Sequence, residues 1–123
     1  MIRPSLQSMT VDQLVERFAA LGVEQSKAID ADNNEKYARL FELMMDVEKE
    51  MKLRSGDQRR ALMALYSYPN MQVRLAAAKA TLATVPQAAR QVVEAIAAST
   101  WPPQCYDARS CLRMLDEGAF RPA

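Results

Sequence analysis

The sequence has no histidine, the side chain that proteins use most often as a general base and as a metal ligand. It also lacks a glycine-rich phosphate-binding loop and a Gly-x-Ser-x-Gly nucleophile motif. Carboxylates are plentiful, but the run Asp46, Glu48 and Glu50 is typical of a solvated helix face. These absences predict a chain that is not an enzyme and that holds neither a cofactor nor a metal ion.

Cysteine and long apolar runs are scarce as well. The two cysteines, Cys105 and Cys111, do not have the spacing of a zinc motif. On one helix they would lie about 9 Å apart, farther than the ~7 Å that a disulfide spans. No apolar run approaches the roughly 18 residues of a membrane span, and the first residues lack the apolar core of a signal peptide. We therefore expect a cytoplasmic protein that does not enter a membrane.

Glycine is rare, with three residues, and β-branched or aromatic runs are short. Alanine, leucine, methionine, arginine, glutamate and glutamine, which favour helices, make up much of the chain instead. Half of the 123 residues are hydrophobic and a quarter are charged, as in a folded soluble domain. The composition predicts one all-α domain without a sheet.

Charge is unevenly distributed along the chain. Residues 1–50 hold 10 acidic and 6 basic side chains, whereas residues 51–123 hold 5 acidic and 10 basic ones. This asymmetry favours an encounter with a charged partner. A solvated surface with internal charge complementarity is the plainer interpretation.

Hydrophobic periodicity predicts six helices. Residues 1–8 have no periodic pattern and are expected to form a flexible N-terminal tail, with a single helical domain over residues 9–123. Thr10 and Gln13 have the spacing of a capping box, and Phe120 is expected to fold back as a plug. The helices are expected at about residues 11–31, 35–53, 58–66, 71–84, 86–98 and 106–117. Short loops between them predict three antiparallel hairpins.

A period of 35 residues runs through these hairpins. The pairs Ala38-Arg39, Val73-Arg74 and Ala108-Arg109 are 35 residues apart, and each lies early in the second helix of its hairpin. Fixed periods of this length are typical of helical solenoids, in which each hairpin buries its apolar face against the next one. We therefore predict a short right-handed α-α solenoid of about three helical hairpins.

The best-preserved copy of the repeat extends from Pro69 to Leu82. Its Pro-Asn turn, its Val73-Arg74 pair and the small Ala77 resemble the second-helix signature of HEAT repeats. The corresponding copy at Ala38-Arg39 has bulky residues where this one has alanines. The resemblance implies a HEAT-like packing unit.

The chain from about Met9 to Pro122 also resembles a family of small bacterial proteins, largely from proteobacteria, that is known only as a domain of unknown function. The segments that carry this resemblance are residues 36–41, 69–82, 94–99 and 115–120. It implies a compact HEAT-like α-solenoid. It brings no established activity, so no functional residue is transferred from it.

The periodic arginines Arg39, Arg74 and Arg109 admit two interpretations. They could form a basic row that meets phosphates or an acidic protein. We favour a structural role, in which each guanidinium holds a turn carbonyl or a carboxylate of a neighbouring hairpin. Asp32 and Asp107 are the candidate carboxylate partners.

Three aromatic residues at hairpin ends are the candidates for partner binding: Tyr66, Tyr68 and Trp101. Such residues are often partly buried plugs, and they are also favoured anchors of protein interfaces. The methionines Met44, Met45, Met51 and Met63 are interpreted as core filler, with an adaptable binding groove as the alternative.

These features favour a non-enzymatic module that binds another macromolecule. A protein partner is expected, in an adaptor or in an immunity protein that masks a toxin, because stacked hairpins present extended binding surfaces. The alternative is a DNA-binding protein in the style of base-repair solenoids, for which the net charge of +1 is low. A lyase or chaperone role toward a chromophore is a third possibility that no residue selects.

Overall fold

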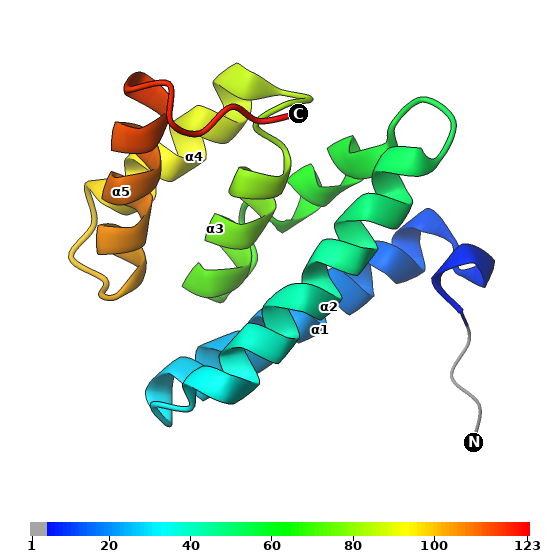
Figure 1. Ribbon diagram of the computed structural model, residues 1–123, viewed down its shortest axis with the longest axis horizontal. Helices are drawn as coiled ribbons and strands as arrows, with labels where there is room; N and C mark the ends of the chain where they lie inside the picture. Colours follow the sequence, from blue (N-terminus) through cyan, green and yellow to red (C-terminus); the bar gives the residue numbers. More distant parts are fainter. Residues whose placement is uncertain (1–4) are drawn as a thin grey trace. The chain divides into compact units, whose positions relative to one another are not determined.

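The computed structural model describes residues 5–123, and these form an all-α protein. No strand occurs in this range, which confirms the predicted fold class (Figure 1). Six helices match the six expected ones, and a short additional 3₁₀ turn precedes them. In chain order the elements are η1 (Leu6–Ser8), α1 (Val11–Asp30), α2 (Asn34–Leu53), η2 (Gln58–Leu65), α3 (Met71–Ala80), α4 (Pro86–Ala97) and α5 (Gln104–Asp116).

The chain forms two compact units, Met1–Ala61 and Leu62–Ala123. The first unit is an antiparallel hairpin of α1 and α2, which pack along their lengths (Figure 1). Thr10 begins α1 with the predicted capping box: its hydroxyl accepts the Gln13 backbone N–H at 3.1 Å, and the Gln13 side chain accepts the Thr10 N–H at 2.9 Å. Asn33 caps α2 with a single bond, in which its side-chain oxygen accepts the Lys36 backbone N–H at 3.1 Å.

The predicted N-terminal tail lies partly outside the described residues, because residues 1–4 are not among them. Within the remainder, Leu6–Ser8 form the single 3₁₀ turn η1. The Nη2 of Arg54 donates to the Leu6 carbonyl at 3.0 Å, while its Nε binds Glu50 at 2.9 Å. Residues 6–8 are thus held to the end of α2.

The third predicted helix differs from expectation, since Gln58–Leu65 is a 3₁₀ helix and not an α-helix. Gly56 and Asp57 precede it with φ values of 77° and 48°, so the chain turns sharply just before the segment. Asp57 binds the guanidinium of Arg59 through both carboxylate oxygens, at 2.9 and 2.7 Å. Pro69 follows closely, and a segment this short gains little from the cooperativity that favours long α-helices.

In the second unit, α3 packs against α4, and α4 packs against α5 (Figure 1). Asn70 caps α3, and Pro86 occupies the first turn of α4, where its missing N–H is tolerated. The α3 helix was expected to reach Thr84 but ends at Ala80. The hydroxyl of Thr81 donates to the Ala77 carbonyl at 2.8 Å, and such side-chain bonds compete with continuation of the helix.

Small side chains fill the core of the second unit. Ala78, Ala89 and Ala108 come from three different helices and are all inaccessible to solvent. Phe120 packs against this core as predicted, after Gly118 ends the last helix with a φ of 74°. Cys105 and Cys111 are buried free thiols on α5.

Candidate binding groove

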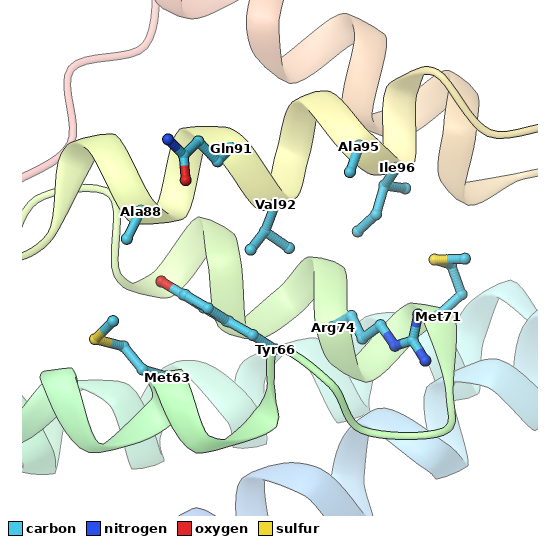
Figure 2. Close-up of a pocket in the computed structure, with 9 residues that line it drawn as sticks. All are labelled: Met63, Tyr66, Met71, Arg74, Ala88, Gln91, Val92, Ala95 and Ile96. Atoms are coloured by element: carbon cyan, nitrogen blue, oxygen red, sulfur yellow. The ribbon is translucent and has the colours of Figure 1, made fainter.

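An open groove of about 380 Å³ lies within the second unit, between α4 and the segment from Met63 to Arg74 (Figure 2). This volume falls in the range of about 300–1,000 Å³ that is usual for ligand sites. Apolar side chains form most of its walls. The lining residues are Met63, Tyr66, Met71, Arg74, Ala88, Gln91, Val92, Ala95 and Ile96.

One wall of the groove is a face of α4. Ala88, Val92 and Ala95 follow the spacing that places side chains on one side of a helix. The buried residues Ala89 and Val93 lie on the adjacent arc and belong to the core. Ile96 belongs to the same core and Val92 packs against it, so the groove-lining face of α4 overlaps its core face, while Ala88 and Ala95 extend it toward the groove.

The opposite wall carries Met63, Tyr66 and Met71, all half-buried. The Tyr66 hydroxyl lies 2.6 Å from the Thr81 hydroxyl oxygen. Because the single hydroxyl hydrogen of Thr81 goes to the Ala77 carbonyl, Tyr66 is the donor of this bond and its oxygen remains available as an acceptor. Burial raises the pKa of Tyr66 above its ordinary value, so the phenol is neutral at physiological pH.

Arg74 brings the positive charge to the groove. Its Nε donates to the carbonyl of Tyr68, the residue that ends the turn after η2. The acceptor is a turn carbonyl, but the turn belongs to the hairpin of Arg74 itself and not to a neighbouring hairpin as expected. The same side chain also lines the groove, a role that the repeat interpretation did not include.

The other two periodic arginines lie outside the groove. The Nε of Arg109 donates to the Ala97 carbonyl at 2.8 Å, at the end of α4, and its guanidinium stacks over the Tyr106 ring at 5.4 Å. Arg39 is exposed on α2, and within residues 5–123 it forms no hydrogen bond or salt bridge. Neither Asp32 nor Asp107 pairs with these arginines, since Asp107 binds Lys79 and Asp32 forms no side-chain pair in the described range.

The structure separates the three aromatic candidates. Tyr66 lines the groove, and Tyr68 contributes its backbone carbonyl to Arg74. Trp101 lies in the loop before α5 and is not a plug, because its side chain is 62% exposed. Tyr106, which sequence reasoning did not select, is 61% exposed near it in the chain.

The methionines selected from the sequence lie in different environments. Met44 and Met51 are buried in α2 as expected of core filler, but Met45 is 46% exposed, so that prediction was wrong for it. Met63 lines the groove together with Met71, which was not among the selected methionines. The groove residues of α4 were missed because alanines at helical spacing look like packing positions. The continuation of the apolar spacing of Val92 through Ala88 and Ala95 is the signal that could have revealed them.

The arrangement is suited to binding and not to an obvious reaction. The polar groups of the groove are a guanidinium, a neutral phenol and the Gln91 amide. Among the described residues, no group of three or more potential metal ligands is placed to hold an ion. Over the same range, no helix combines the length and apolar character needed to span a membrane. Burial raises the pKa of the Cys111 thiol, which makes it a poor nucleophile at neutral pH.

Comparisons with known proteins give a family and a fold but no activity. The family model described as a domain of unknown function, DUF2019, matches residues 12–116. The crystal structure of the protein RPA1889 from Rhodopseudomonas palustris CGA009 is similar to this chain, with 48% identity and a TM-score of 0.94. That match covers 98% of this chain and 100% of the other. No curated protein matches the chain.

Proposed function

We propose that this chain, which belongs to the DUF2019 family of unknown function, is a non-enzymatic module that binds another protein through the groove of its second unit. The observation that carries the proposal is the open, mostly apolar groove of about 380 Å³ between α4 and residues 63–74. Open grooves lined mostly by apolar side chains with a few polar groups are the usual form of binding sites, and we infer that a partner covers this one.

The composition of the walls supports a protein partner. Met63 and Met71 are unbranched and polarizable, and such side chains adapt to varied apolar partners. Tyr66 and Arg74 are residue types that dominate interface energetics when a partner excludes water from them. The groove is also open, as expected for a site that receives a segment of polypeptide. An adaptor and a toxin-immunity protein would use this groove in the same way.

The proposal is tested by selection from a phage-displayed library of random dodecapeptides against the full chain. We expect enriched peptides that bind the wild-type protein and lose about tenfold or more in affinity for Ala95→Trp, because the indole occupies the groove. Gln87→Trp is the matched control, since Gln87 is an exposed residue of α4 that does not line the groove. Failure to enrich any peptide that distinguishes the two variants would count against the groove as a protein-binding site.

We also propose the HEAT-like solenoid as the finer description of the fold. It is supported by the positions of Arg39, Arg74 and Arg109, which lie in the first two turns of α2, α3 and α5 at the 35-residue period. A crystal structure of the full chain tests it. We expect the three hairpins to be related by a constant right-handed rotation, and hairpins related by unequal rotations would contradict it.

Nucleic-acid binding is the second candidate, and one observation favours it. Trp101 and Tyr106 are exposed aromatic residues near the start of α5, and Arg109 stacks over the Tyr106 ring at 5.4 Å. Exposed aromatic and arginine side chains form platforms for unpaired bases. Fluorescence anisotropy with a labelled single-stranded oligonucleotide at low ionic strength tests this candidate. Absence of salt-dependent binding there removes it.

A further inference from the structure

Arg74 is the only cationic side chain among the groove residues that the structure describes, and it has no acidic partner. No carboxylate within residues 5–123 forms a salt bridge with it. A guanidinium offers five N–H donors, and only the Nε of Arg74 is used, by the Tyr68 carbonyl. Its two terminal nitrogens therefore remain for another acceptor.

The acidic residues of the second unit are mostly committed elsewhere. Residues 62–123 contain four carboxylates and six arginines or lysines. Asp107 binds Lys79, while Glu94 and Asp116 both bind Arg90. The fourth, Glu117, is exposed at the end of α5. The unit thus has no internal carboxylate assigned to Arg74, and the groove carries an uncompensated positive charge.

We propose that the groove recognises an apolar segment of a partner protein that carries an aspartate or glutamate, with the carboxylate bound by the terminal nitrogens of Arg74. This inference rests on the proposed protein-binding function and specifies the chemistry of the partner. The bond from Nε to Tyr68 holds the planar guanidinium in place, which lowers the ordering cost of a two-point contact with a carboxylate. Half-burial of Arg74 strengthens that contact relative to a fully solvated one.

The position of Arg74 also determines which end of the groove receives the acidic residue of the bound segment. Figure 2 shows Arg74 and Met71 at one end, opposite Ala95 and Ile96, with Met63 and Tyr66 at the other end. The carboxylate therefore lies at the Arg74 end, and apolar side chains extend past Val92 toward Met63. A hydrogen-bond donor of the partner finds the free acceptor of the Tyr66 oxygen there.

The length of the groove predicts a spacing in the partner. Ala88 and Ile96 are eight residues apart on α4, which corresponds to about 12 Å along the helix. A partner helix covers this distance in about two turns, and an extended strand covers it in about four residues. The acidic residue and the far apolar anchor should therefore be separated by seven or eight positions in a helix, or by about four in an extended peptide.

Two peptide libraries test the inference with the full chain. Both are phage-displayed dodecapeptides and are identical except that one omits aspartate and glutamate. We expect groove-dependent peptides, defined by loss of binding to Ala95→Trp, mainly from the complete library and with the acid at the predicted spacing. Replacing that acid by its amide in a synthetic peptide should weaken binding about tenfold or more, as expected for a charge-assisted contact.

A matched pair of variants tests the role of Arg74 without removing its bond to Tyr68. Ala95 lies on α4 at the Arg74 end of the groove, so Ala95→Glu supplies a competing carboxylate while Ala95→Gln has the same size without charge. We expect acidic peptides to bind Ala95→Glu about tenfold more weakly than Ala95→Gln. Equal binding to both variants would overturn the role of Arg74.

The outcomes separate this inference from the function on which it rests. Tight groove-dependent peptides from the acid-free library would overturn carboxylate recognition and leave protein binding in place. If neither library yields a peptide that Ala95→Trp disrupts, the proposed function itself fails and the inference fails with it. Acidic peptides that discriminate Ala95→Glu from Ala95→Gln support both.

Discussion

The first unit is built from two helices of 20 residues each, whereas α3, α4 and α5 of the second unit have 10, 12 and 13 residues. The long helices pack against each other along their lengths, and local contacts such as the Thr10 capping box and the Glu50–Arg54 pair add to their stability. The short helices depend on contacts between elements, because isolated helices of this length are marginal in water. Examples are the buried bond from Gln104 to Gln72 at 3.0 Å and the pair of Lys79 with Asp107.

The difference explains why the groove occurs in the second unit. The wall of the groove opposite α4 begins at the end of a 3₁₀ helix, which has about 3.0 residues per turn. The other wall is the α-helix α4, which has about 3.6 residues per turn. Ridges with different repeats do not interlock along their length as those of two α-helices do. In the first unit, α1 and α2 are both regular α-helices that pack closely. The groove therefore accompanies the less regular secondary structure.

The largest expected effect tests how strongly the short helices depend on close packing. Ala77 is inaccessible in α3, so Ala77→Phe should overpack the interior and lower the free energy of unfolding by about 1–3 kcal/mol. Urea unfolding followed by circular dichroism measures the change. Ala20→Phe in the long helix α1 is the control, because Ala20 is exposed and its replacement should change stability by at most about 0.5 kcal/mol. Similar losses for both variants would show that the loss at Ala77 does not come from overpacking of a buried position.

Replacing the periodic arginines, which occupy the same position of the 35-residue repeat, should lower stability by a smaller amount. Arg74→Ala removes the bond to the Tyr68 carbonyl and should cost about 1 kcal/mol. Arg39→Ala in the first unit should cost less than about 0.5 kcal/mol, because Arg39 is exposed. Thermal unfolding of the two variants in parallel provides the measurement. Equal losses would indicate that the period, and not the local contact, determines the role of these residues.

Local sequence signals predicted the first unit well, because its helices begin at explicit caps. The first two helices were expected to start at about residues 11 and 35, and they start at Val11 and Asn34, after the caps Thr10 and Asn33. The helix types and bounds of the second unit were predicted less accurately. The 3₁₀ conformation of η2 and the early end of α3 depend on the bonds of Asp57 and Thr81, and the apolar pattern does not encode these contacts.

The candidate site was predicted only in part. Tyr66 was selected for its position at a hairpin end, and Arg74 for its place in the repeat, but nothing in the linear sequence joined them. The groove also requires α4, whose Ala88 and Ala95 have the small side chains expected at a packed interface. Which face of such a helix remains uncovered depends on the path of the chain after residue 97, a tertiary property that periodicity does not report.

The smallest expected effect concerns pH and separates two carboxylates of the first unit. Burial raises the pKa of Glu48, which the positive charges of Arg59 and Lys52 only partly offset, whereas the hydrogen bond from Arg59 lowers the pKa of Asp57. The folded state thus binds the Glu48 proton more tightly than the unfolded chain does. Its contribution to stability declines as pH rises from the ordinary glutamate range through the raised pKa. Asp57 behaves in the opposite sense, since its contribution is present above the ordinary aspartate range and is lost as pH falls.

Glu48→Gln removes the first of these dependences. Relative to the wild type, we expect this variant to gain stability as pH rises from about 4 to 7, by roughly 0.5 kcal/mol, the size usual for partly exposed positions. Asp57→Asn should instead lose relative stability as pH rises toward the ordinary aspartate range, mostly below about pH 4, because the amide cannot form the charged bond to Arg59. Urea unfolding at several pH values measures both trends.

Parallel pH profiles for the two variants would mean that burial of Glu48 and the Arg59 bond of Asp57 do not act on stability with opposite signs. Opposite slopes would place the acidic pH response in the first unit, since the shifted groups of the second unit, Tyr66, Arg90 and Cys111, have pKa values raised from ranges that are already alkaline.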